Sequence, residues 1–244
     1  MQWKTKQGHD LERMEFMNSY KLGNLRIVDL SKMLDPKTET RRCHLTRFNT
    51  GGPIPDFHTI IDITSHLGTH CEGPYHHDEN WPSIADLPMN TFMGRAIYVV
   101  FKDVKPRSYL TPAILDTYCA PMMKKDDIVI IDSPYRILPF TELTNTDQDQ
   151  RLLVNGDTAV WFRDHGAKCI GFGNGVSIEN RNEDVKPFHD VLLAKNIVFL
   201  EVLQHLDELQ ADTFFMSYVP LPIKGLDSCP VRAYAIEGLP GFTR

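Results

Sequence analysis

Short runs of apolar and β-branched residues, bounded by turn residues or charges, recur along the chain from residue 25 onward. Such runs predict β-strands, because alternate side chains of a strand reach opposite faces and either face can be buried. The predicted strands are residues 25–30, 57–64, 95–102, 127–132, 168–172, 197–203, 213–221 and 231–236. Residues 127–132 are almost wholly apolar, which is expected of a strand that is covered on both faces.

Three segments between these strands carry helix signals instead. The dipeptide Thr111-Pro112 supplies an N-cap and a proline at the first helical position of a helix that runs to about residue 119. Residues 155–165 predict a second helix, closed by the glycine that follows. Residues 187–195 predict a short third helix, again with a proline at its start.

The order of these elements indicates the fold class and the domain organisation. Strands interspersed with helices are typical of a mixed α/β fold, which we expect to form one domain over residues 25–244. The polar segment 1–24 has only weak helical spacing and predicts an N-terminal arm. Residues 31–55 carry turn residues and charges and predict a long loop, with room for a short hairpin.

The composition limits the classes of function. The chain has 244 residues and a net charge of −6, and it lacks a basic run, so nucleic-acid binding is not expected. No apolar run approaches a membrane span, and residues 1–8 lack the apolar core of a signal peptide, so we expect a cytoplasmic protein. The five cysteines are odd in number and form no CxxC pair, which indicates reduced thiols and excludes a zinc ribbon.

The segment of residues 66–77, HLGTHCEGPYHH, contains four of the ten histidines of the chain. Residues two apart share a face of an extended segment, so the even-numbered side chains would project to one side. These include His66, His70, Glu72 and His76. Imidazole nitrogens and a carboxylate suit Zn²⁺, Mn²⁺ or Fe²⁺, and the absence of thiolates favours a catalytic over a structural metal. The alternative is a polar strand that faces solvent.

A straight strand cannot bring His66 and His70 to one ion. Four residues of extended chain cover about 13 Å, whereas each nitrogen ligand lies about 2.0–2.1 Å from zinc. The backbone must therefore bend between the two histidines, and Gly68 is the residue that permits a bend.

A second carboxylate, Glu201, lies in the otherwise apolar strand 197–203. A charge buried there without a partner is costly, so such a carboxylate usually faces a cation or a metal. The alternative is an edge-strand glutamate that faces water or an arginine. His189 is expected in the first turn of the helix 187–195, from where it can reach the same ion as Glu201.

The order His-x-Gly-Thr-His-x-acid-x-Pro-x-His over residues 66–76 resembles the signature of the cyclase family of metal-dependent hydrolases. That family includes bacterial kynurenine formamidase and isatin hydrolase. His189 and Glu201 resemble the later His and Glu of the family, and residues 221–233, LPIKGLDSCPVRA, resemble its closing segment. The resemblance covers about residues 25–237. The family usually has Asp at the position of Glu72.

This resemblance implies a swivelling β/β/α fold and a centre of one or two divalent metal ions, Zn or Mn. It implies a homodimer or homotetramer in which subunits contribute to each other's substrate pockets. It also implies His76 as the acid/base histidine. The implied metal ligands are His66, His70, Glu72, His189 and Glu201.

We therefore expect a hydrolase that cleaves an amide or formamide C–N bond of a small aromatic or cyclic substrate with metal-activated water, like the arylformamidase of tryptophan catabolism. A lactone or cyclic-imide hydrolase, or a ring-closing cyclase, is an alternative with the same centre. A non-catalytic metal-binding module is the alternative of another class. A histidine that carries protons beside the ligands, His76, argues against that module.

Overall fold

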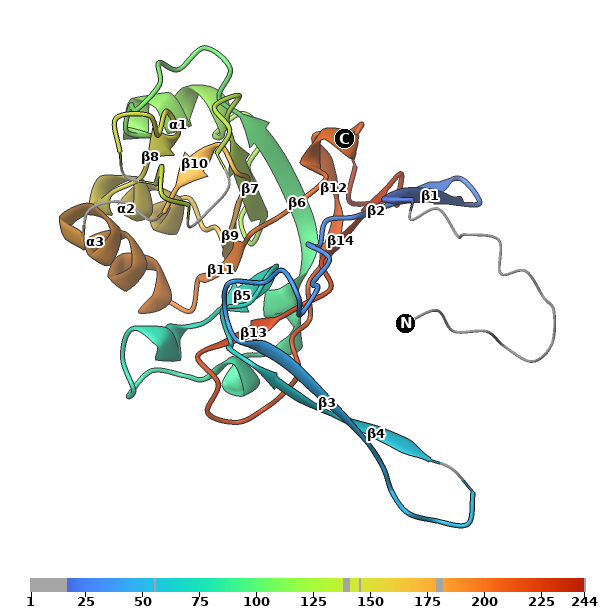
Figure 1. Ribbon diagram of the computed structural model, residues 1–244. Helices are drawn as coiled ribbons and strands as arrows, with labels where there is room; N and C mark the ends of the chain where they lie inside the picture. Colours follow the sequence, from blue (N-terminus) through green and yellow to red (C-terminus); the bar gives the residue numbers. More distant parts are fainter. Residues whose placement is uncertain (1–16, 55, 138–140, 145, 179–181, 244) are drawn as a thin grey trace.

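The computed structural model describes residues 17–54, 56–137, 141–144, 146–178 and 182–243, which form a mixed α/β fold built on one large sheet (Figure 1). Ten strands within these residues pair in the order β1-β2-β14-β12-β6-β7-β9-β11-β5-β13. In that order their bounds are Ser19–Leu22, Leu25–Asp29, Tyr234–Glu237, Thr213–Ser217, Met93–Val100, Ile128–Asp132, Cys169–Phe172, Val198–Glu201, His70–Glu72 and Ser228–Pro230. Two small separate sheets pair β8 (Leu152–Leu153) with β10 (Val176–Ser177) and β3 (Cys43–Asn49) with β4 (Phe57–Ile63).

In the middle of the large sheet, β6, β7, β9 and β11 pair in parallel. Parallel neighbours need crossover connections, and here each connection contains a helix. Those helices are α1 (Pro112–Tyr118), α2 (Gly156–Asp164) and α3 (Asn182–Leu193). All three lie on one side of the sheet in Figure 1. Within the described residues, four 3-10 helices lie in the connections: η1 (Pro74–His76), η2 (Ile84–Asp86), η3 (Met89–Phe92) and η4 (Leu206–Glu208). None of the described helices is long and apolar enough to cross a membrane.

Each face of the parallel strands contributes to its own hydrophobic core. Val129 and Phe199 lie in one core together with residues of the helices, whereas Ile128 and Val198 lie in the other. Neighbouring residues of a strand reach opposite faces, so a strand between two cores must be apolar throughout. Every residue of β7 is buried, which confirms that this strand is covered on both faces.

A strand lies at each of the eight predicted positions, and the mixed α/β fold class is confirmed. Strands β8, β10 and β13 were not predicted, and β1 and β3 correct assignments of the sequence analysis. Residues 19–22, assigned to the arm, form β1 and pair with β2, while residues 1–16 lie outside the described residues. Strand β3 lies in the predicted loop 31–55. All of its residues except Cys43 are exposed, so it lacks the apolar pattern by which a strand is recognised.

Helix α3 corrects the prediction for residues 187–195. The helix includes Asn182, so Pro187 lies inside it rather than at its start. Glu183 and Asp184 in its first turn are acidic residues of the kind that stabilise a helix N-terminus. His189 consequently lies in the second half of the helix and not in its first turn.

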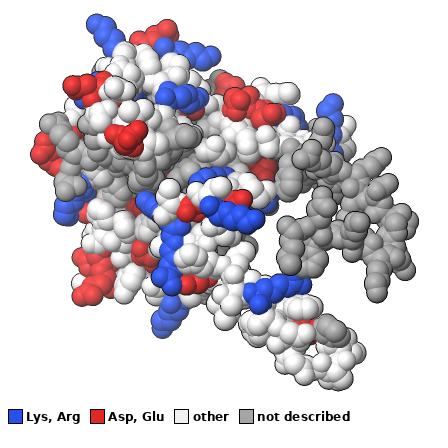
Figure 2. Space-filling view, in the orientation of Figure 1, with Lys and Arg blue, Asp and Glu red and all other residues white. Residues whose placement is uncertain are grey.

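The hairpin of β3 and β4 extends away from the rest of the protein (Figure 1). Its register places Leu45 directly opposite Ile61 and Cys43 opposite Ile63, so these four side chains share one face. Leu45 is 55% exposed and Ile61 65%. Figure 2 shows few charged residues on the projecting part of the hairpin. An apolar face is therefore left in contact with solvent.

Candidate metal centre

The register of β5 brings the first two candidate ligands together. Strand β5 lies between β11 and β13, antiparallel to both, and pairs His70 directly with Glu201. Directly opposite residues of antiparallel strands project to the same face. His70 Nε2 and Glu201 Oε2 lie 3.4 Å apart as a result. Residues that are 131 positions apart in the sequence thus meet through one strand pairing.

Gly68 forms the bend that the distance argument requires. Its φ is +60°, in the left-handed region that favours glycine. A Cβ atom at this position would also lie 2.6 Å from Leu34 Cδ2, so the end of the Leu34 side chain would have to shift. The bend brings the rings of His66 and His70 to a centroid distance of 5.1 Å. The predicted bend is confirmed.

Glu72 lies at the middle of the cluster. Its Oε2 is 3.3 Å from His66 Nδ1 and 3.7 Å from His76 Nε2, and its Oε1 is 3.4 Å from His189 Nε2. Two groups of possible ligands, each with its atoms within 4.8 Å of one another, share this carboxylate. One group is His66, His70 and Glu72. The other is Glu72, His189 and Glu201. The structure therefore brings together all six residues that the sequence analysis selected.

Two buried atoms of the cluster have no hydrogen-bond partner among the described residues. They are His70 Nε2 and Glu72 Oε1, on side chains that are 1% and 3% exposed. Buried polar atoms are almost always hydrogen-bonded, so each atom that is not requires an explanation. A divalent cation bound by nitrogen and oxygen ligands would satisfy both atoms. The residues present therefore fit a metal ion.

The electrostatics of the cluster agree with a missing positive charge. Burial and the negative charge of Glu201 raise the pKa of Glu72 from 4.5 to about 8. Burial acts to raise the pKa of Glu201 too, but the neighbouring His70 and His189 lower it to about 2. Burial lowers the pKa of His189 to about 4, so its imidazole is neutral at pH 7. Neutral imidazole is the form that binds a metal.

The metal-free protein is expected to lose about 1.5 kcal/mol of unfolding free energy between pH 6.5 and pH 8. The pKa of Glu72 is higher in the folded state than its ordinary value of 4.5, so the folded state binds more protons over this range. Stability therefore falls as the pH rises. The lowered pKa of His189 acts mainly below pH 6.5 and does not cancel this loss. Urea unfolding in chelator at the two pH values measures the difference.

The matched control for this experiment is Glu72→Gln, which retains the shape of the side chain and cannot ionise. Its unfolding free energy should lack this loss, because all other titrating groups are the same in both proteins. An equal loss in the variant would assign the pH dependence to another group.

His77 lies behind the cluster and supports His189. Its ring stacks on that of His189, with centroids 4.7 Å apart and planes 8° from parallel. Its Nδ1 lies 2.7 Å from Asp190 Oδ1, which fixes the orientation of the ring. His77 is therefore a structural neighbour of the candidate ligands, in agreement with its odd position in the histidine segment.

Asp227 is the site residue that the sequence analysis did not select. Its Oδ2 lies 2.8 Å from His66 Nε2 and 3.4 Å from His76 Nδ1. It comes from the connection before β13, within the recognised segment 221–233. One feature of the sequence could have identified Asp227 as a site residue: it is the single acidic residue of that segment.

The backbone beside Glu201 is strained. Val202 has a φ of +56°, which a β-branched residue rarely adopts. The carbonyl oxygen of Val202 accepts a hydrogen bond of 2.7 Å from Thr69 Oγ1. The hydroxyl of Thr69 in turn accepts a bond of 2.8 Å from the backbone N–H of Lys32. These bonds join the residue after Glu201 to the residue before His70, and strain of this kind is typical of functional sites.

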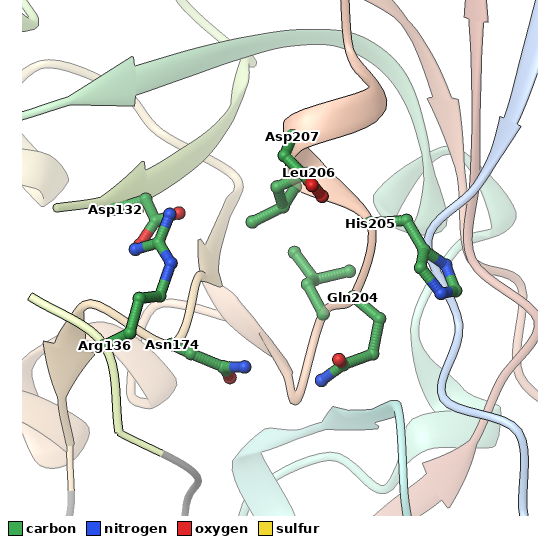
Figure 3. Close-up of a pocket in the computed structure, with 8 residues that line it drawn as sticks. Asp132, Arg136, Asn174, Gln204, His205, Leu206 and Asp207 are labelled. Atoms are coloured by element: carbon green, nitrogen blue, oxygen red, sulfur yellow. The ribbon is translucent and has the colours of Figure 1, made fainter. Parts of the chain in front are cut away.

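Two cavities border the segment after Glu201. One of about 270 Å³ lies beside His66 and Gly68 and is also lined by Arg41 and Gln204. A second of about 210 Å³ is lined by Asp132 and Asn174 (Figure 3). In Figure 3 the side-chain amides of Asn174 and Gln204 point into the second cavity. Gln204 lines both cavities. The first cavity, beside His66, has room for a small molecule next to the cluster.

Comparison with known proteins agrees with this geometry. The family model described as "Putative cyclase" matches residues 28–176, more than half of the 244 residues. A solved structure of a potential metal-dependent hydrolase with cyclase activity is similar with a TM-score of 0.66 and 18% identity, over 87% of this chain and 98% of that chain. Isatin hydrolase A from Labrenzia aggregata is similar with a TM-score of 0.67 and 19% identity, over 87% and 93% of the two chains.

Isatin hydrolase A from Ralstonia solanacearum is similar with a TM-score of 0.67 and 18% identity, over 88% of this chain and 92% of that chain. At these identities the structural likeness establishes the fold. The match to the family model goes further, because it includes the whole histidine segment: this chain belongs to the cyclase family.

Proposed function

We propose that this protein is a metal-dependent hydrolase that cleaves an amide or formamide C–N bond of a small aromatic or cyclic substrate. The observation that carries the proposal is the pair of buried atoms without a hydrogen-bond partner among the described residues, His70 Nε2 and Glu72 Oε1. They lie inside a cage of three histidines and two glutamates. Ligands of this kind suit Zn²⁺ or Mn²⁺. The two ligand groups that share Glu72 have places for one ion or two.

A divalent cation held by this cage would supply Lewis-acid chemistry: it would lower the pKa of a water molecule and polarise the carbonyl oxygen of a substrate. The chain itself supplies the proton transfer. The side chain of His76 is 33% exposed, and its Nε2 faces Glu72. An imidazole exchanges protons near neutral pH, so His76 can take a proton from the attacking water and donate it to the leaving nitrogen. The cavity beside His66 is the place for the substrate.

The similar structures support a cyclic amide as one substrate class, since two of them are isatin hydrolases and isatin is a cyclic amide fused to an aromatic ring. A lactone or cyclic-imide hydrolase, or a ring-closing cyclase, would use the same centre. The cavity beside His66 favours any of these enzymes over a non-catalytic metal-binding module, which has no need of a substrate space.

The test is a substrate panel with metal-loaded protein. The metal-free protein is loaded with Zn²⁺ or Mn²⁺ and incubated with N-formylkynurenine, isatin and an aryl lactone. Hydrolysis of the first two, absent in chelator, is the expected result. Hydrolysis of the lactone alone would replace the amide proposal with the alternative. No hydrolysis of any substrate by protein shown to hold metal would contradict both.

We also propose that the protein is a homodimer or homotetramer that buries the hairpin of β3 and β4. An isolated two-stranded hairpin is at best marginally stable in water, and the face with Leu45 and Ile61 is apolar and exposed. Ile61→Glu is expected to reduce the molar mass measured by light scattering to that of one chain. Lys195→Glu, at an exposed residue after α3 and outside the hairpin, is the control and should leave the mass unchanged. A wild-type protein of 28.0 kDa in solution would contradict the proposal.

A further inference from the structure

One oxygen of Asp227 contacts two histidines of the candidate centre. Its Oδ2 lies 2.8 Å from His66 Nε2 and 3.4 Å from His76 Nδ1. A carboxylate oxygen has two lone pairs and can accept from both rings. Asp227 Oδ2 is therefore placed to accept a hydrogen bond from each ring.

These contacts favour one ring nitrogen of each histidine as the one that carries the proton. An imidazole that donates to a carboxylate through one nitrogen presents the lone pair of the other. A hydrogen bond from His66 Nε2 to Asp227 would leave Nδ1 unprotonated, 3.3 Å from Glu72 Oε2. A hydrogen bond from His76 Nδ1 to Asp227 would leave Nε2 unprotonated, 3.7 Å from the same oxygen. Both free nitrogens thus face the middle of the cluster.

The position of Asp227 is itself fixed by the chain. Its carbonyl oxygen accepts a hydrogen bond of 2.8 Å from the backbone N–H of Gly73, the residue after Glu72. A Cβ atom at Gly73 would lie 2.7 Å from Ile84 Cδ1, so the end of that buried side chain would have to shift. The backbone of Asp227 is thereby held against the residue that follows β5, which carries two of the candidate ligands.

We propose that Asp227 is a positioning residue that fixes the tautomers of a metal ligand, His66, and of the proton carrier, His76. The inference rests on the proposed function. A carboxylate that orients a metal-binding histidine increases metal affinity, and one that orients a general base also stabilises the imidazolium that forms. Asp227 does both with one oxygen, and it thereby couples metal binding to proton transfer.

The rival role for Asp227 is that of a ligand. His66, His76 and Asp227 form a third group whose ligand atoms lie within 4.8 Å of one another. The separation of 2.8 Å between His66 Nε2 and Asp227 Oδ2 is that of a hydrogen bond, which favours the positioning role.

The experiment compares wild type, Asp227→Ala and Asp227→Asn. Long-range ¹⁵N–¹H spectra of the metal-free proteins report the tautomer of each histidine. Wild type should show a proton on Nε2 of His66 and on Nδ1 of His76, and Asp227→Ala should show mixed tautomers of both. Metal affinity, measured by competition with a chelator, should fall about 10–100-fold in Asp227→Ala. At saturating metal, kcat should fall while KM changes little.

Asp227→Asn retains the size of the side chain, and it should shift the tautomers even if Asp227→Ala fails to fold. Asp190→Ala is the control, because it removes a carboxylate from a histidine outside the three groups, His77, and should leave the tautomers of His66 and His76 unchanged. Unchanged tautomers and metal affinity in both Asp227 variants would overturn the inference, as would the loss of one bound ion per chain. Shifted tautomers in a protein without hydrolase activity would support the inference and contradict only the proposed function.

Discussion

His70→Ala is expected to lower metal affinity by more than about 100-fold, which is beyond the cost of losing a residue that only orients a ligand. His70 is almost fully buried and is paired in register with Glu201. Its Nε2 has no hydrogen bond within the part of the chain that the structure describes, so the loss of the ring removes a nitrogen that a cation would satisfy. Hydrolase activity should be lost together with the metal.

Competition with a fluorescent chelator measures this affinity, and elemental analysis after dialysis counts the ions that remain. His165→Ala is a suitable control. His165 is exposed, its ring stacks on Trp161 at a centroid distance of 3.7 Å, and it belongs to none of the three ligand groups. Full metal occupancy in His70→Ala would show that the centre is formed by other residues.

The part of this site that could be predicted from the sequence rests on short-range geometry. Four extended residues separate His66 and His70 by more than the length of two metal–nitrogen bonds, so the backbone must bend at Gly68. This argument does not depend on the rest of the fold. Glu72 lies two residues after His70, which similarly predicts that the two side chains project to the same face of the strand. The apolar strand 197–203 predicts that Glu201 is buried, since its neighbours on both sides are apolar.

The contacts between distant segments could not be predicted in this way. The 3.4 Å separation of His70 and Glu201 depends on the register of β5 with β11, which no local pattern specifies. Asp227 reaches its two histidines across more than 150 residues, from a connection with turn character. Strand β3 is exposed along almost its whole length, so only its pairing with β4 makes it a strand.

His76→Ala is expected to lower kcat by about 10²–10⁴-fold, the usual contribution of a general acid–base, while the bound metal is retained. Of the histidines nearest Glu72, His76 has the most exposed side chain and the longest contact, 3.7 Å. It belongs to neither of the two ligand groups that share Glu72. Its place beside the cage and next to solvent suits a proton carrier, because the proton that it accepts must leave on a product.

The matched comparison is His77→Ala, which removes the neighbouring imidazole. His77 contacts Asp190 and stacks on His189, so its loss should weaken metal binding through His189 without removing the proton carrier. Added imidazole should therefore restore part of kcat in His76→Ala and none in His77→Ala. If His76→Ala instead loses its metal while His70→Ala retains it, both role assignments are wrong: His76 is then a ligand, His70 is not, and the proton must be carried by another group.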